Sequence, residues 1–182
     1  IGNMDGGLHE INQKNGTNTA NIAHHSKGLF SIIWKDQQLY TLGGEGKLTR
    51  WKSSPLKPEL SIQLSNLPLR CADFCPRRNE WAIGASDGNI YLLDGENLTP
   101  KTTIPNAHQN SVFAIRYHPE KPYLISGGRD AHLNVFELET QEKMVSLPAH
   151  WFTINSIAFS PTLPYFATAS RDKTVKIWDA NE

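Results

Sequence analysis

Histidine–aspartate pairs with a fixed separation are the residues of this chain that could carry chemistry. His150 precedes Asp172 by 22 residues, and His108 precedes Asp130 by the same 22 residues. A carboxylate that orients an imidazole can make it a general base, but catalysis also requires a nucleophile and a substrate cleft beside the pair. No Ser-His-Asp or paired-carboxylate arrangement can be placed around these residues. We therefore predict that the pairs are structural and expect no catalytic residue.

Two further clusters could bind a metal. Cys71 and Cys75 are four residues apart, and on a strand this spacing puts their Cα atoms about 13 Å apart, too far for a disulfide. Structural zinc normally takes four Cys or His ligands, and neighbouring arginines make these cysteines a poor site. His24 beside His25 is an equally incomplete ligand set. Free thiols are expected, with no metal and no cofactor.

The acidic residue of the pairs recurs along the whole chain. Its successive positions are separated by 40, 42, 43 and 42 residues: Asp5, Glu45, Asp87, Asp130 and Asp172. A period of this length is the mark of a repeat protein. His25 precedes Glu45 by 20 residues rather than 22, which predicts one shortened turn in the first repeat.

Each repeat contains four short apolar runs separated by turns. The first run of the last repeat places Ile154, Ile157 and Phe159 at steps of three and then two, which indicates a bulged start of a strand. Prolines follow the first run in three repeats, at Pro76, Pro119 and Pro161. Four strands in about 42 residues are typical of a propeller blade. The expected fold is therefore all-β, a β-propeller of four-stranded antiparallel blades.

The motif Lys-Ile-Trp-Asp at 176–179, with Ala-His at 149–150 where Gly-His is usual, resembles the WD-repeat (WD40) family. The resemblance implies a hydrogen-bonded relay within a blade. In the last repeat the relay would join His150, Ser170, Asp172 and Trp178.

The other repeats match this relay less well. The third keeps His108 and Asp130 but has Gly128 and Phe136 at the Ser and Trp positions, so its relay is expected to be reduced to one pair. The second has Ser65, Ala85, Asp87 and Leu93 and should lack the relay. The first has a partial set, namely His25, Gly43, Glu45 and Trp51.

The resemblance also divides the chain into blades. Residues 1–23 would be the end of a blade and a connecting outer strand, followed by blades at 24–63, 64–106 and 107–148 and a last blade at 149–182 that lacks its outer strand. Closed WD propellers most often have seven blades, or roughly 290 residues. We therefore expect an incomplete ring of about four and a half blades, the C-terminal portion of a longer propeller. Missing blades or a second copy would close it.

Composition excludes some partners. The chain has 18 basic and 18 acidic residues and no net charge, so no overall field attracts nucleic acid or an anionic membrane. No apolar run is long enough to span a bilayer. We expect a cytoplasmic protein.

Partner-binding residues should lie on loops rather than among the relay residues. By resemblance, residues at one rim of the propeller line the entrance to its channel: Phe30, Arg70, Phe113, Arg129, Trp151, Asn155 and Arg171. Aromatic residues and arginine are enriched among interface anchors, and acidic or phosphorylated partners would suit the arginines. Alternatively, Arg129 and Arg171 pair with neighbouring acids, while Phe113 and Trp151 pack between blades.

The expected function is a non-catalytic interaction scaffold that presents a propeller surface to protein or peptide partners. The alternative is a propeller-based enzyme, such as a hydrolase or a quinoprotein-like enzyme, whose catalytic residues lie in the missing blades. Fold alone does not decide between them.

Overall fold

The computed structural model describes residues 1–181, which form strands and turns and contain no helix. The chain divides into two compact units. The N-terminal unit is Ile1–Arg70, and the C-terminal unit begins at Cys71. None of the described residues forms a helix that could cross a membrane.

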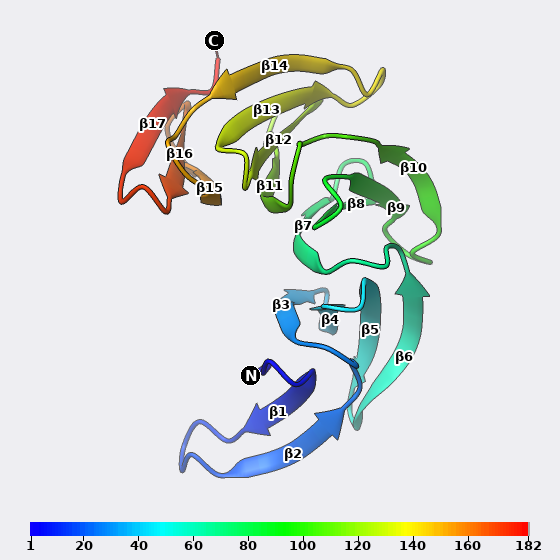
Figure 1. Ribbon diagram of the computed structural model, residues 1–182. Coiled ribbons are helices and arrows are strands. Elements are labelled where there is room, and N and C mark those ends of the chain that lie inside the picture. Colours follow the sequence, from blue (N-terminus) through cyan, green and yellow to red (C-terminus); the bar gives the residue numbers. More distant parts are fainter. Residues whose placement is uncertain (182) are drawn as a thin grey trace. The chain divides into compact units, whose positions relative to one another are not determined.

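The N-terminal unit contains two antiparallel sheets, drawn in blue to cyan in Figure 1. The smaller sheet pairs β1 (Gly7–Ile11) with β2 (Asn18–Ala23). The larger sheet has the order β3-β4-β5-β6. Its strands are β3 (Leu29–Lys35), β4 (Gln38–Gly43), β5 (Lys47–Ser53) and β6 (Leu56–Gln63).

Three further antiparallel sheets follow along the chain, each in simple sequence order. The first consists of β7 (Leu69–Cys75), β8 (Glu80–Ala85), β9 (Ile90–Asp94) and β10 (Pro100–Ile104). The second consists of β11 (Val112–Tyr117), β12 (Tyr123–Gly128), β13 (His132–Glu137) and β14 (Lys143–Pro148). The third has three strands: β15 (Ile154–Phe159), β16 (Tyr165–Ser170) and β17 (Val175–Asp179).

The bulged start of the first strand is confirmed. The pairing register shifts between Leu29 and Ser31 in β3, between Val112 and Ala114 in β11, and between Ile154 and Ser156 in β15. A bulge leaves one residue outside the ladder and redirects its side chain. The residues skipped in this way are Phe30, Phe113 and Asn155.

The shortened turn of the first repeat lies between β3 and β4. Only Asp36 and Gln37 separate these strands, and both have positive φ, 48° and 62°. Two residues of this conformation form the tight hairpin turn whose twist matches antiparallel strands. The corresponding connections in the last two sheets are longer, at 118–122 and 160–164.

Apolar contacts join neighbouring sheets within the C-terminal unit. Leu133 of the β11–β14 sheet packs in one cluster with Ile154, Ile157 and Phe166 of the β15–β17 sheet. These two sheets, green to yellow and orange to red in Figure 1, therefore share a core. Burial of such side chains contributes about 25 cal/mol for each Å² of apolar surface removed from water.

Both cysteines are free thiols, as expected. Burial raises the pKa of Cys71 to about 12, and its thiol lies 3.6 Å from the carbonyl oxygen of Val112. A thiol that stays protonated is a poor nucleophile and a poor metal ligand. Among the described residues, no group of three or more His, Cys, Asp and Glu side chains is placed to hold a metal ion.

Candidate functional site

The last sheet contains a complete relay. His150 Nδ1 lies 2.9 Å from Asp172 Oδ2, and His150 Nε2 lies 2.8 Å from Thr168 Oγ1. The Trp178 indole N–H donates to the same Thr168 oxygen over 2.9 Å. A neutral imidazole that donates to the carboxylate and accepts from the hydroxyl satisfies every group in this chain of bonds.

The prediction that Ser170 supplies the relay hydroxyl is wrong. The Ser170 hydroxyl donates to the Phe152 carbonyl oxygen over 3.0 Å and accepts from the Asp172 N–H over 3.0 Å. Residues two apart on a strand share a face, so Thr168 lies on the same face of β16 as Ser170. The strand register determines which of the two hydroxyls the tryptophan reaches. Trp178 of β17 pairs with Phe166 of β16, and Thr168 is two residues from Phe166, whereas Ser170 is four residues away.

The third repeat has more of the relay than its sequence suggested. His108 Nδ1 lies 2.9 Å from Asp130 Oδ1, and His108 Nε2 lies 2.8 Å from Ser126 Oγ. The expected reduction to one pair is therefore wrong, because Ser126 supplies the hydroxyl. Gly128 stands where a Cβ would collide with His108 Nδ1 and Asp130 Oδ1, so the close approach of this pair requires glycine.

The first repeat also holds a complete relay, where only a partial set was predicted. His25 Nδ1 lies 2.6 Å from Glu45 Oε1, and His25 Nε2 lies 2.7 Å from Thr41 Oγ1. The Trp51 N–H donates to Thr41 Oγ1 over 2.8 Å. Glutamate thus replaces aspartate without loss of a relay member.

The second repeat uses apolar side chains at the same positions. Ile83 and Leu93 take the places of the relay hydroxyl and tryptophan, and both are fully buried. Asp87 accepts hydrogen bonds from the Tyr91 hydroxyl at 2.7 Å and from the Asn89 N–H at 2.9 Å. The second repeat therefore lacks the relay, as its sequence predicted.

Two of the relay carboxylates are held in the charged form. Burial by itself raises the pKa of Asp130, but the hydrogen bond from His108 and backbone N–H bonds outweigh it and lower the pKa below its ordinary value of 3.8. The pKa of Asp172 is lowered in the same way, against desolvation, by the Thr174 hydroxyl, the Trp151 N–H and His150. A carboxylate that accepts several hydrogen bonds keeps its charge.

The relay histidines are not placed to act on a substrate. Both ring nitrogens of His108 and His150 are engaged in hydrogen bonds, and neither side chain has exposed surface. A general base must reach the proton that it removes. The geometry of these pairs therefore supports a structural role.

The relay acids also accept hydrogen bonds from the backbone of neighbouring loops. Asp172 Oδ2 accepts the Trp151 N–H over 3.0 Å, and Asp130 Oδ2 accepts the Gln109 N–H over 2.9 Å. The Ala131 carbonyl accepts N–H groups of Ala149 and His150 over 3.1 and 3.2 Å. The turn that carries Arg129 is thereby bonded to the segment that carries Trp151.

These bonds bring part of the predicted partner surface together in the C-terminal unit. We give the name rim to the four predicted residues Arg129, Trp151, Asn155 and Arg171 together with Phe152, which was not predicted. Trp151 is 87% exposed and Phe152 is 59% exposed. Arg129, Asn155 and Arg171 are exposed as well, whereas Phe113 is half-buried.

The two rim arginines are not ion-paired with the relay acids, which pair with His108 and His150. No ion pair joins Arg129 or Arg171 to any acid within residues 1–181. The exposure of Trp151 likewise speaks against its packing between sheets. The alternative explanation of Arg129, Arg171 and Trp151 therefore has no support among the described residues, whereas the half-buried Phe113 remains compatible with it.

The other two predicted rim residues belong to the N-terminal unit and contact each other. The Arg70 guanidinium lies over the Phe30 ring, with Cζ 4.0 Å from the ring centroid. Such a cation–π contact holds both side chains in place. Both are half-buried.

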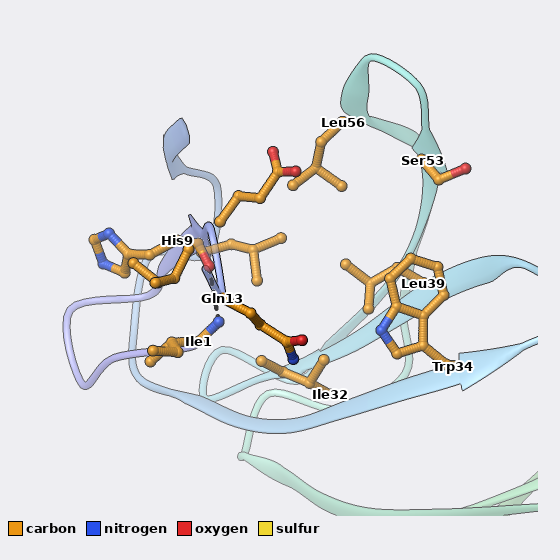
Figure 2. Close-up of a pocket in the computed structure, with 11 residues that line it drawn as sticks. Ile1, His9, Gln13, Ile32, Trp34, Leu39, Ser53 and Leu56 are labelled. Carbon is orange, nitrogen blue, oxygen red and sulfur yellow. Dashed lines mark hydrogen bonds between the residues drawn. The ribbon is translucent and has the colours of Figure 1, made fainter. Parts of the chain in front are cut away.

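The N-terminal unit also contains a cavity that was not predicted. A cavity of about 620 Å³ lies among side chains of β1, β3 and β4 and nearby residues, including Ile1, Ile32, Trp34 and Leu39. Figure 2 shows Trp34 and Leu39 on one side of the cavity and Ile1 and His9 on the other. Trp34 is 62% exposed. The lining is mostly apolar and suits contact with apolar groups, although His9 and Glu10 also border the cavity.

Comparison with known proteins agrees with the repeat pattern. Residues 99–137 and 141–179 each match the family model described as "WD domain, G-beta repeat". The chain can be superposed on a chain of a crystal structure of the mitotic checkpoint complex with a TM-score of 0.85 and 17% sequence identity. The match covers 98% of this chain and 58% of that chain.

Several similar proteins are WD-repeat proteins much longer than this chain. The human serine-threonine kinase receptor-associated protein is 25% identical over 159 residues, which cover 86% of this chain and 44% of that protein. Protein HIR1 of Gibberella zeae is 28% identical over 169 residues, covering 78% and 16%. Nuclear distribution protein PAC1 of Candida albicans is 33% identical over 102 residues, covering 52% and 21%.

The sheets, the relays and these matches define the class of fold, a β-propeller built from four-stranded antiparallel blades. The chain contains two matched WD40 repeats and is similar to WD-repeat proteins. It spans less than half the length of each of these three relatives.

Proposed function

We propose that the chain is a non-catalytic interaction scaffold that captures protein or peptide partners on the rim. The observation that carries the proposal is the 87% exposure of Trp151 on a backbone held by a relay carboxylate. Tryptophan and arginine are over-represented among residues that dominate binding energy. A rigid loop also loses little conformational entropy when a partner binds.

The similar proteins support this class of function. One is named as a serine-threonine kinase receptor-associated protein, and one of the similar solved structures is that of the mitotic checkpoint complex. Propeller blades offer loops to partners while the relays remain buried, so one frame can serve many recognition surfaces. A cytoplasmic location stays a prediction, which imaging of a fluorescent fusion would test.

Site-specific photo-crosslinking tests the proposal. A photoreactive amino acid replaces Trp151 in one variant and Leu163 in a control variant, since Leu163 is also exposed, at 60%, but lies on the β15–β16 connection. After irradiation in cell extract, we expect discrete crosslinked proteins at position 151 and at most weak, diffuse products at position 163. Equal yields at both positions, or none at 151, would contradict the proposal.

A further inference from the structure

We propose that the segment captured by the rim is anionic and carries an apolar anchor. It would be a peptide with clustered carboxylate or phosphate groups next to an aliphatic or aromatic side chain. This inference rests on the proposed function and names the chemistry of the partner.

The four repeats provide an internal comparison of charge at one position. The residue before the relay acid is Gly44, Ser86, Arg129 or Arg171 in successive repeats. The backbone frame is the same in three of them, because the N–H of Gly44, Arg129 and Arg171 donates to the carbonyls of Gly28, Ser111 and Thr153 over 2.8, 2.8 and 2.9 Å. Only the last two repeats display a cation there. The positive charge is therefore a property of the rim and not of the repeat frame.

Nearby acids do not neutralise these arginines by ion pairing. Asp130 and Asp172 follow the arginines directly, but their oxygens face His108 and His150 and the backbone N–H groups of Gln109 and Trp151. Lys173 adds a further exposed cation beside Arg171. Exposed charges of one sign attract the opposite sign and fix the orientation of a partner.

The apolar part of the partner would meet Trp151 and Phe152. The Trp151 N–H is bonded to Asp172, and the Phe152 carbonyl accepts from the Ser170 hydroxyl over 3.0 Å. Both aromatic residues therefore start from a fixed backbone while their rings remain free to contact a partner. An aromatic anchor beside arginine is the composition found at the centre of protein interfaces.

Aromatic rings and arginine can also bind single-stranded nucleic acid, through stacking and phosphate contacts. The chain as a whole has no net charge, which disfavours a partner recognised mainly through its phosphate backbone. We therefore favour a peptide and treat RNA as an outcome of the test.

The test compares pools of fluorescent peptides on the purified chain. Each peptide is about twelve residues long with a central Leu or Trp, and its flanks contain glutamate, phosphoserine, glutamine or lysine; oligouridylate is a fifth probe. Binding is measured by fluorescence anisotropy near physiological salt. We expect the glutamate or phosphoserine pool to bind about tenfold more tightly than the glutamine pool, and the lysine pool to bind most weakly. The stronger of the two anionic pools identifies the source of the charge.

Charge-reversal variants locate the effect. Arg129→Glu with Arg171→Glu should shift the preference from anionic to lysine peptides, and Trp151→Ala should weaken every pool. Lys143→Glu is the matched control, because Lys143 is exposed on β14 outside the rim and should leave the preference unchanged. Arg129→Gln with Arg171→Gln repeats the test without adding charge. Circular dichroism confirms that each variant is folded.

Binding of both anionic pools no tighter than binding of the glutamine pool would overturn the inference, as would tighter binding of oligouridylate than of any peptide. Crosslinking at position 151 separates this failure from failure of the scaffold itself. Discrete crosslinks without a charge preference would leave the proposed function in place and remove only the anionic partner.

Discussion

The β7–β10 and β15–β17 sheets share one repeat frame but fill its interior with opposite chemistry. In β15–β17, Thr168 accepts from Trp178 and bonds His150, which in turn bonds Asp172. In β7–β10 the places of Thr168 and Trp178 are taken by Ile83 and Leu93, both with no exposed surface. The frame therefore does not require the polar relay.

The difference shows that apolar side chains can take the place of polar relay members, provided that the polar groups that remain have partners. A buried polar network is stable only when each member has a partner, whereas an apolar substitute needs only to fill the volume. The β11–β14 sheet fits this rule, since it replaces the tryptophan by Phe136 and still satisfies both ring nitrogens of His108. Removing a single member should therefore cost more than the bond that is lost.

The largest expected effect comes from His150→Ala. The change opens a cavity and removes bonds to Thr168 and Asp172, so we expect the C-terminal unit to lose about 3 kcal/mol of unfolding free energy. Urea denaturation followed by circular dichroism measures it. Tyr91→Phe in the β7–β10 sheet is the control, because it removes one bond to Asp87 and should cost about 1 kcal/mol. A smaller loss in His150→Ala than in the control would contradict the view that the β15–β17 sheet depends on its polar relay.

A second substitution separates the two candidate hydroxyls. Thr168→Val keeps the shape but leaves the Trp178 N–H and His150 Nε2 without a partner, at a cost of about 2 kcal/mol. Ser170→Ala removes a hydroxyl near the surface, and we expect a loss of about 0.5 kcal/mol. The same denaturation experiment applies to both. If Ser170→Ala proves the more damaging, Ser170 is the relay hydroxyl after all.

The smallest effect concerns pH. Because the pKa values of Asp130 and Asp172 are lowered in the folded state, their stabilising contribution is fully present above the ordinary aspartate pKa of 3.8. It is lost as the pH falls through the folded values. The urea midpoint should therefore drop between about pH 4 and about pH 2, and less so in the Asp130→Asn, Asp172→Asn double variant. A double variant with an unchanged acid dependence would exclude these two groups as its cause.

The sequence was sufficient for the repeat and much of its local geometry. The recurring acid defined the period, the step from Ile154 to Ile157 marked the bulge, and the short interval from His25 to Glu45 marked the tight turn at Asp36 and Gln37. These features are local, so spacing alone records them. The sheet order follows because each strand pairs with its neighbour in sequence.

The relay hydroxyl was harder to predict because strand periodicity leaves two positions on one face. A signal was present: the residue four before the relay acid is Thr41, Ser126 or Thr168 in the three repeats that carry the histidine. Strand register, which depends on two strands together, determines which of the two positions supplies the relay hydroxyl. The exposure of Phe152 and Trp34 depends on which side chains pack over them, and it cannot be read from the residue type alone.

The bulge at the start of each first strand has a consequence for how recognition could change. Phe30, Phe113 and Asn155 lie outside the pairing register, so replacing one of them leaves the neighbouring inter-strand pairs as they are. Three equivalent positions already hold two phenylalanines and an asparagine without altering the sheet behind them. If the proposed function holds, binding preference and foldability depend on separate positions, and a propeller of this kind can acquire a new specificity while its architecture stays the same.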